Sequence, residues 1–186
     1  MTGNPFNASG AAAFSEVLSR GLPKTGQVTC YMESDDGYFQ AGWWQGLFVE
    51  NNRSRFITEK LYGVNVVTDR ATGLMWAADG DGDGCGGGSD YIWADAILYC
   101  QNLNFAGFTD WRLPNVFELF SICNAQKRNP CVDTSIFPNT LASAYWTSTT
   151  RKYYTIYASV IDFMEIFVSY LNKADEYRIR AVRGGL

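Results

Sequence analysis

Two segments with helical spacing lie in the middle of this sequence, and short strand-like runs lie on both sides of them. Between Gly26 and Trp76 turn residues interrupt short apolar runs, and from Tyr145 onward apolar and polar residues alternate, as they do in strands. The clearest strand candidates are residues 64–68, 73–77, 158–160 and 167–169. Helices enclosed by two strand regions indicate an α+β domain, which is the fold class that we expect.

The residues at the start of each central segment predict where the two helices begin. Ser89 is in position to cap the first helix, which continues past Cys100 and is expected to end near Gly107. Asn115 is in position to cap the second helix, and Glu118 at the third helical position completes a capping box. We therefore expect two helices packed on short, mostly antiparallel strands, with the termini close together and sharing a sheet.

The composition fits one globular domain. The chain has 186 residues, of which 47% are hydrophobic, and this is enough for one core but not for two full domains. Residues 1–20 are expected to form an N-terminal leader or docking arm, and residues 21–186 the folded domain. No run is long enough to insert into a membrane, and no signal peptide is visible near the first residue.

Histidine content and net charge exclude several function classes. The chain contains no histidine, which excludes Ser-His-Asp and Cys-His catalysis as well as zinc or haem bound by histidine. No acid/base pair of carboxylates emerges either, so we do not expect an enzyme. The net charge of −4 and the pI of about 4.8 give no electrostatic basis for binding nucleic acid or an anionic membrane.

The cysteines leave two interpretations open. They are Cys30, Cys85, Cys100, Cys123 and Cys131. An odd count leaves at least one thiol outside any disulfide. The short loop between Cys123 and Cys131 makes this pair the first disulfide candidate, and Cys85 with Cys100 is the second. The alternative is that all five are reduced thiols of a cytosolic chain, because cysteine content alone does not report the compartment.

The Gly/Asp-rich run from Asp79 to Asp90 has the ligand spacing of a calcium loop. Asp79, Asp81 and Asp83 alternate with glycines, and Asp90 stands at the twelfth position, as in an EF-hand loop. The run therefore predicts a structural Ca²⁺ site; no organic cofactor is expected. The alternative is a solvated loop, because a strand precedes Asp79 and aspartate at the twelfth position is a poorer bidentate ligand than glutamate.

Several phrases of the sequence occur in the same order as in a known family. They are LPKTGQ (22–27), TGLMW (72–76), WADA (93–96) with Tyr99 and Cys100, TDWRLPN (109–115), FPNT (137–140), YWTSTT (145–150) and VRGG (182–185). Over residues 21–186 the chain resembles the family of C-terminal domains of the bacterial collagen-like adhesin Lcl. The resemblance implies a C-type-lectin-like fold, related to that of formylglycine-generating enzymes. Four tryptophans are then expected to be buried scaffold residues: Trp76, Trp93, Trp111 and Trp146.

The C-terminal strands depart from this family. Residues 158–166 read ASVIDFMEI, where members usually show AWYVDF and then a polar turn with glycine. Residues 145–177 also hold six of the eleven tyrosines, where an even spread predicts about two. The pattern resembles the variable proteins of diversity-generating retroelements, which use this fold to display a hypervariable C-terminal ligand-binding surface, often on a phage, virus or cell exterior. The resemblance implies that residues 145–177 are a variable region displayed on a virion or cell surface.

The exposed, ligand-binding face is expected to consist of thirteen side chains within this region. They are Arg151, Lys152, Tyr153, Tyr154, Tyr157, Ser159, Ile161, Met164, Glu165, Phe167, Ser169, Tyr170 and Leu171. Aromatic side chains on a rigid framework anchor a ligand at low entropic cost, and the polar ones adjust hydrogen bonding. For Ile161, Phe167 and Leu171, burial in the sheet core is an equal alternative, because these residue types favour strands in any case.

We expect a non-enzymatic recognition protein whose C-terminal face binds a protein or glycan ligand on a target surface. One alternative is a polysaccharide-binding adhesin module with a local basic patch. The patch would contain Arg151, Lys152, Arg178, Arg180 and Arg183. The other alternative is an enzyme related to formylglycine-generating enzymes, which is disfavoured because the closest cysteine pair, Cys123 and Cys131, does not lie on the C-terminal strands.

Overall fold

The computed structural model describes residues 22–40, 47–48 and 53–184, and its architecture is α+β, as the sequence predicts. The helical segments are α1 (Asp36–Phe39), the 3₁₀ segment η3 (Asp83–Gly88), α2 (Trp93–Gln101) and α3 (Val116–Ser121). The strands are β1 (Leu47–Phe48), β2 (Arg53–Ser54), β3 (Phe56–Leu61), β4 (Val64–Asp69), β5 (Leu74–Ala77), β6 (Tyr91–Ile92), β7 (Ala144–Thr150), β8 (Tyr157–Asp162), β9 (Phe167–Asn172), β10 (Glu176–Tyr177) and β11 (Val182–Arg183). The predicted leader, residues 1–20, lies outside the described residues.

The larger sheet has the strand order β11-β5-β4-β3, and all its pairs are antiparallel. β3 and β4 form a hairpin whose turn residues, Tyr62 and Gly63, have φ values of 49° and 90°. Two positive φ values suit a tight hairpin, because they match the twist of the strands. β11 joins β5, so the C-terminal end of the domain is part of this sheet. Residues 22–40, at the start of the predicted domain, contribute no strand to this sheet, so the prediction that both ends of the domain share it is not confirmed.

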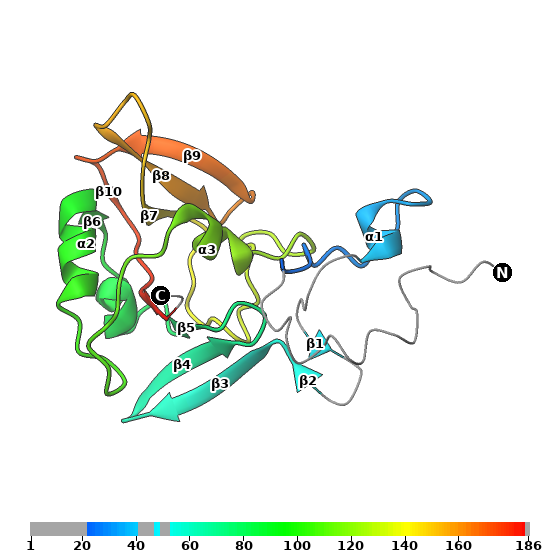
Figure 1. The fold of residues 1–186 in the computed structure, drawn as a ribbon, viewed down its shortest axis with the longest axis horizontal. Helices are drawn as coiled ribbons and strands as arrows, with labels where there is room; N and C mark the ends of the chain where they lie inside the picture. Colours follow the sequence, from blue (N-terminus) through cyan, green and yellow to red (C-terminus); the bar gives the residue numbers. More distant parts are fainter. Residues whose placement is uncertain (1–21, 41–46, 49–52, 185–186) are drawn as a thin grey trace.

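The smaller sheet has the order β7-β8-β9 and is also antiparallel. β8 is the middle strand, and its residues from Ala158 to Ile161 are all buried. β9 pairs with β8 along its whole length, from Asp162 opposite Phe167 to Tyr157 opposite Asn172. Figure 1 shows this sheet above the larger one, with α2 along one side of the molecule.

Two clusters of buried side chains hold these elements together. One cluster contains Trp76 of β5, Leu119 of α3 and Phe163 beyond β8, and the other contains Trp146 of β7 and Cys100 of α2. The expected burial is confirmed for Trp76, Trp111 and Trp146, whereas Trp93 is only half-buried. The four predicted strands are confirmed as parts of β4, β5, β8 and β9.

Helix α2 begins later and ends earlier than predicted. Tyr91 and Ile92 pair with β10 as strand β6, so Ile92 precedes the first helical residue and Ser89 instead ends η3. The prediction that Ser89 caps the helix is therefore wrong, because the neighbouring strand pair takes the residues that would have formed the first turn. The helix ends at Gln101, well before Gly107.

Helix α3 has the predicted capping box. The Asn115 side chain accepts hydrogen bonds from the N–H groups of Phe117 and Glu118, and the Glu118 carboxylate accepts one from the Asn115 N–H. Glu118 also pairs with Arg112 at 2.7 Å, and this contact raises the pKa of Arg112. Arg112 in turn donates to the carbonyl of Gly184, which connects α3 with the end of the domain.

The segment before the larger sheet contains a helical turn that the sequence does not predict. The run Asp35-Asp36-Gly37 predicts a turn between two apolar runs, but in the structure Asp35 caps α1, because its side chain accepts a hydrogen bond from the Tyr38 N–H. Figure 1 shows α1 on an arm that extends away from both sheets. The other predicted breaks in this region, at Gly42, Gly46 and residues 51–52, lie outside the described residues.

Candidate recognition surface

An exposed group of aromatic and basic side chains lies where the β7–β8 loop meets β9. We call it the aromatic–basic cluster, and its members are Arg151, Lys152, Tyr153, Tyr154 and Tyr170. The Arg151 guanidinium lies 4.8 Å from the ring centre of Tyr154 and 4.7 Å from that of Tyr170, and the Lys152 ammonium lies 5.0 Å from that of Tyr153. The exposed fractions of Tyr153, Tyr154 and Tyr170 are 83%, 57% and 45%. Each cation therefore orders a ring that still faces solvent.

Backbone hydrogen bonds close the loop that carries this cluster. The Arg151 N–H donates to the Tyr157 carbonyl at 3.0 Å, and the Tyr157 N–H donates to the Tyr154 carbonyl at 2.9 Å. At the other end the Lys173 N–H donates to the Ile156 carbonyl at 2.9 Å. The loop is therefore attached to β8 and β9, so its side chains are displayed from a fixed backbone.

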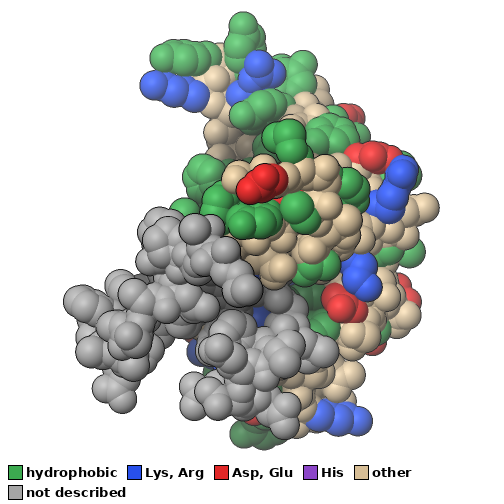
Figure 2. Space-filling view, turned by 90° about the vertical axis from the view of Figure 1, so that its right-hand side faces the viewer, with side chains coloured by type: hydrophobic (Ala, Val, Ile, Leu, Met, Phe, Trp, Pro, Cys, Tyr) green, Lys and Arg blue, Asp and Glu red, His purple; other side chains and the backbone are tan. Residues whose placement is uncertain are grey.

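The cluster carries positive charge that the described part of the chain does not neutralise. Arg151 and Lys152 form no ion pair with the described acidic residues, whereas the arginines at positions 112, 128, 178 and 183 each do. Figure 2 shows hydrophobic and basic side chains together at the upper end of the molecule, where the β7–β8 loop lies in Figure 1. An anionic group on a ligand would therefore find a cation there without displacing a protein carboxylate.

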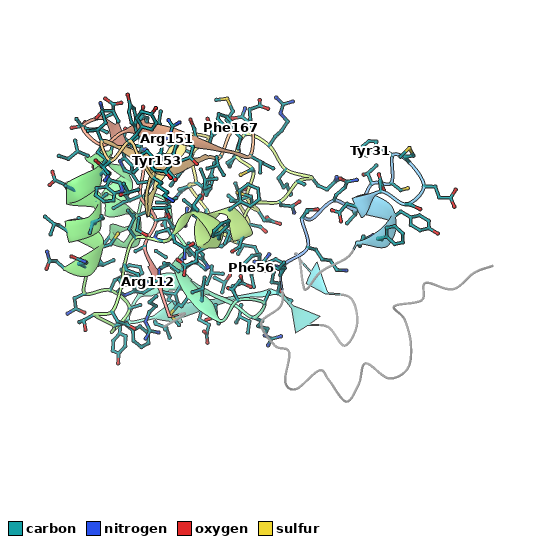
Figure 3. The ribbon with its side chains drawn as sticks, turned by 45° about the horizontal axis from the view of Figure 1, so that its top comes forward. Tyr31, Phe56, Arg112, Arg151, Tyr153 and Phe167 are labelled. Carbon is teal, nitrogen blue, oxygen red and sulfur yellow. The ribbon has the colours of Figure 1, made fainter. Side chains whose placement is uncertain are left out.

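A second exposed group lies in the turn between β8 and β9 and at the start of β9. Met164, Glu165 and Phe167 are exposed there, and Glu165 pairs with Arg128 at 2.9 Å. The Asp162 side chain accepts the Met164 N–H at 2.7 Å and so fixes the turn. Figure 3 shows Arg151 and Tyr153 close together and Phe167 further along the same sheet. The two groups therefore lie on one rim of the molecule.

The structure separates the thirteen predicted residues into three groups. Exposed residues are Arg151, Lys152, Tyr153, Tyr154, Met164, Glu165, Phe167 and Tyr170. Half-buried residues are Tyr157, Ser169 and Leu171. The remaining two, Ser159 and Ile161, have exposed fractions of only 2% and 0%. The prediction that Ser159 faces solvent is wrong, and for Ile161 the alternative of burial in the sheet core is confirmed, because both lie on β8, the middle strand of the sheet, where α3 packs against it.

Sequence reasoning missed three residues of this rim. Ile156 in the loop and Val168 on β9 are exposed apolar side chains, and Lys173 follows β9. The Lys173 ammonium lies 3.7 Å from the ring centre of Trp93 and donates to the Thr150 hydroxyl, and partial burial lowers its pKa. The sequence carries no signal for Val168, because only the strand order β7-β8-β9 shows that β9 is an edge strand.

The basic patch of the adhesin alternative is not assembled. Arg180 is fully buried, and its guanidinium donates to the carbonyls of Ala77 and Ala78. Arg178 pairs with Asp90, and Arg183 pairs with Asp110 at 2.7 Å. The pairing with Arg183 lowers the pKa of Asp110. Of the five basic residues considered, only Arg151 and Lys152 remain available to a ligand.

The aspartates of the Gly/Asp-rich loop do not converge on one point. Asp79 accepts hydrogen bonds from the Asn139 amide and the Asp81 N–H, and Asp90 pairs with Arg178 at 2.8 Å. Throughout the described ranges, which contain the whole loop, no group of three or more acidic or cysteine side chains is placed to hold a metal ion. The predicted convergence of Asp79, Asp81, Asp83 and Asp90 is wrong, because an arginine takes the twelfth-position carboxylate. As placed, these residues do not fit Ca²⁺.

The same loop is not simply solvated either. Gly84, Cys85 and Gly86 are buried, and the Gly84 carbonyl accepts the Ala181 N–H at 2.9 Å. A Cβ atom on Gly84 would lie 2.4 Å from the Cβ of Ala77. Glycine is therefore required at this position because the loop packs directly against β5.

The five cysteines are thiols in this structure. Cys30 is exposed, and the other four are buried. The sulfur atoms of Cys123 and Cys131 lie 3.2 Å apart, so these two cysteines are neighbours. The disulfide between them stays a prediction. Cys85 and Cys100 belong to the same buried cluster. Burial raises the pKa of Cys100 to about 12.

One surface depression lies next to α2, away from the aromatic–basic cluster. Its volume is 580 Å³, and its lining is Tyr91, Asp95, Leu98, Tyr99, Asn102, Leu103 and Asn104. The hydroxyl groups of Tyr91 and Tyr99 donate to the carbonyls of Gly86 and Asp83. These two side chains therefore fix the Gly/Asp-rich loop, which is a structural role.

Comparison with known proteins supports the family that the sequence resembles. A search of curated proteins finds no match. In the part of the chain that the structure describes, no helix is long and apolar enough to cross a membrane. The family model of the Lcl C-terminal domain matches residues 65–183, which is more than half of the chain and includes the whole rim described above. The chain therefore belongs to the Lcl C-terminal domain family.

Proposed function

We propose that this chain is a non-enzymatic ligand-recognition protein whose C-terminal surface, displayed on a cell or virion, binds a protein or glycan on a target. Membership of the Lcl C-terminal domain family suggests an adhesin-like domain. The more specific part of the proposal is that the domain has a C-type-lectin-like fold and is the variable protein of a diversity-generating retroelement.

The observation that carries the proposal is the aromatic–basic cluster. Tyr153, Tyr154 and Tyr170 are exposed although large aromatic rings are normally removed from water, and Arg151 and Lys152 hold their rings in place. Aromatic rings and arginine are the side chains that most often dominate binding energy at protein interfaces. A rigid display of these groups lowers the entropy lost on binding.

A polysaccharide-binding adhesin is the second candidate, and the two available cations favour it only in part. Arg151 and Lys152 offer charge for an anionic chain, but binding a long polyanion normally requires a row of basic residues. Arg178 and Arg183 are already paired with carboxylates, and Arg180 is buried. The surface is therefore better suited to a ligand that contacts aromatic rings and only one or two cations.

The first prediction concerns the three tyrosines. Replacing Tyr153, Tyr154 and Tyr170 with alanine is expected to abolish binding of the labelled full chain to targets found among arrayed glycans, arrayed proteins and intact cells. The melting temperature should change little, because all three rings are exposed. The readouts are fluorescence on the arrays or cells and a thermal melt.

The matched control is Tyr62→Ala. Tyr62 is also an exposed tyrosine, but it lies in the β3–β4 turn, away from the cluster. The Tyr62→Ala variant should bind the same targets as the unmodified chain does. Equal binding by the triple variant and the control would refute the recognition role of the cluster, and loss of folding in the triple variant would mean that these rings support the core.

A further inference from the structure

Strand β9 has an open edge in the smaller sheet. The opposite edge of that sheet is β7, and the segment around Arg178 of the same chain covers it. The Trp146 N–H donates to the Arg178 carbonyl at 2.9 Å, and the Arg178 N–H donates to the Ala144 carbonyl at 3.2 Å. β9 is the last strand on the other side, where no further described strand pairs with it. Figure 1 shows β9 at the outer margin of the sheet.

The register identifies the backbone groups that point outward. The Lys173 N–H donates to the Ile156 carbonyl, so the backbone groups of Lys173 point toward the β8 side. In an antiparallel pair this direction alternates from one residue to the next. The backbone groups that point toward β8 are therefore those of Leu171, Ser169 and Phe167. Val168 and Tyr170 therefore direct their N–H and C=O groups away from the sheet. In the described part of the chain, no hydrogen bond reaches these four groups.

β9 also lacks the features that protect an edge strand from pairing. Its sequence, FVSYLN, contains no charge and no proline, and its pairing with β8 has no bulge. The edge strand of the larger sheet, β3, instead carries the exposed charges Glu59 and Lys60. Proteins normally block exposed edges with charges, prolines or bulges. An unblocked edge in the middle of the candidate recognition surface is therefore suited to accept a strand.

We propose that β9 binds its ligand by strand addition: an extended peptide segment of the target protein pairs with the outer edge of β9 and places an acidic side chain next to Arg151. This inference rests on the proposed recognition function and specifies its ligand as a peptide strand. Outward N–H and C=O groups are satisfied best by another backbone. The Arg151 guanidinium lies over the Tyr170 ring, directly above this strand, and has no described carboxylate partner.

Charge argues against a second copy of this chain as the added strand. Antiparallel pairing of two β9 strands would bring two Arg151 and two Lys152 side chains to one edge, and like charges at short distance repel. β9 itself supplies no carboxylate to offset them. A target strand with aspartate or glutamate near its middle has the complementary charge.

The test starts from a display library of random twelve-residue peptides, selected on the immobilised full chain. The inference predicts enriched peptides in which β-branched or aromatic residues alternate with other residues and in which an acidic residue recurs. On binding of an enriched peptide, hydrogen exchange should slow at the amides of Val168 and Tyr170. The amides of Ser169 and Leu171 already donate to β8 and should change less.

Two variants make the result specific to the edge and the charge. Val168→Pro removes one outward N–H, and it should weaken binding of the enriched peptides about tenfold more than Val168→Ala, which shortens the same side chain but keeps the N–H. Arg151→Glu leaves β9 intact and should reverse the preference from acidic to basic peptides. Slow exchange at Ser169 and Leu171 in each variant shows that β9 still pairs with β8.

Three outcomes would overturn the inference. They are the absence of enriched peptides, equal peptide affinity for the Val168→Pro and Val168→Ala chains, and a dimer in sedimentation that Val168→Pro dissociates. The proposed function fails separately. If the Tyr153, Tyr154 and Tyr170 triple variant loses binding to its targets while Val168→Pro does not, the surface recognises ligands without strand addition.

Discussion

At the residue scale, one amino-acid type has two roles in this domain. Tyr145 is buried and stacks on Phe163 with the ring centres 4.4 Å apart, whereas Tyr153 and Tyr154 are exposed beside basic side chains. The local excess of tyrosine in the sequence contains both groups. What distinguishes them is position, since Tyr145 lies on a strand that is covered on both sides and the other two lie in a loop.

The cysteines give a prediction at the same scale. In the folded protein at pH 8, only Cys30 is expected to react with a thiol reagent before unfolding, because it is exposed and the other four cysteines are buried. The measurement is absorbance after addition of the reagent, first in buffer and then in guanidinium. Rapid reaction of several thiols in buffer would contradict the buried placement.

The same titration decides the disulfide question for Cys123 and Cys131. After purification without reductant, the chain in guanidinium should show five thiols if all cysteines are reduced. A count lower by two would show that one disulfide has formed, and peptide mapping would then identify the pair. The 3.2 Å separation of the two sulfur atoms makes Cys123 and Cys131 the pair to examine first.

At the element scale, the sequence predicts the presence of strands better than their place in a sheet. Alternation correctly places strands at 158–160 and 167–169, and the capping residues correctly place the start of α3. Periodicity cannot tell a middle strand from an edge strand, so the sequence predicts an exposed Ser159 and leaves Ile161 open between surface and core, whereas both are buried. Ser89 was assigned as a cap for a similar reason: only the pairing of β6 with β10 shows that α2 starts later.

The difference between β8 and β9 predicts unequal costs of substitution. Ile161→Ala should lower the free energy of unfolding by about 2–5 kcal/mol, because it leaves a cavity in a fully buried cluster. Phe167→Ala, on the exposed edge strand, should cost less than about 1 kcal/mol. Urea unfolding followed by circular dichroism measures both. Similar losses for the two variants would contradict the assignment of β8 to the core and β9 to the surface.

At the scale of the whole molecule, the charged groups mostly fasten segments that are distant in sequence. Arg183 pairs with Asp110, and Arg178 with Asp90. Arg55 and Asp69 form a buried pair at 2.6 Å at the open end of the β3–β4 hairpin. The sequence shows that such residues exist but not which of them meet, so it predicts neither the pairing of Asp90 with Arg178 nor the burial of Arg180. Arg151 and Lys152 differ from these residues in being available to a ligand.

This distribution of charge predicts the response to calcium. Calcium at about 1 mM, the weakest dissociation constant usual for extracellular calcium sites, should leave the melting temperature unchanged. The reason is that Arg178 already pairs with Asp90 and that the other aspartates do not converge. The comparison is with the same protein in excess chelator, by differential scanning fluorimetry. A clear rise with calcium would show that the loop rearranges into the site that its sequence predicts.

We propose that the rim around β9 is a recognition surface under diversification. The most direct test is deep sequencing of this gene in the population that carries it, together with the flanking DNA. We expect amino-acid differences to concentrate at exposed rim positions such as Arg151, Tyr153 and Phe167, with buried Ser159 and Ile161 unchanged. A reverse transcriptase gene and a near-copy of the 3′ end that differs at adenines should lie nearby. Differences spread evenly over the gene, or an invariant rim with no such neighbours, would contradict the claim.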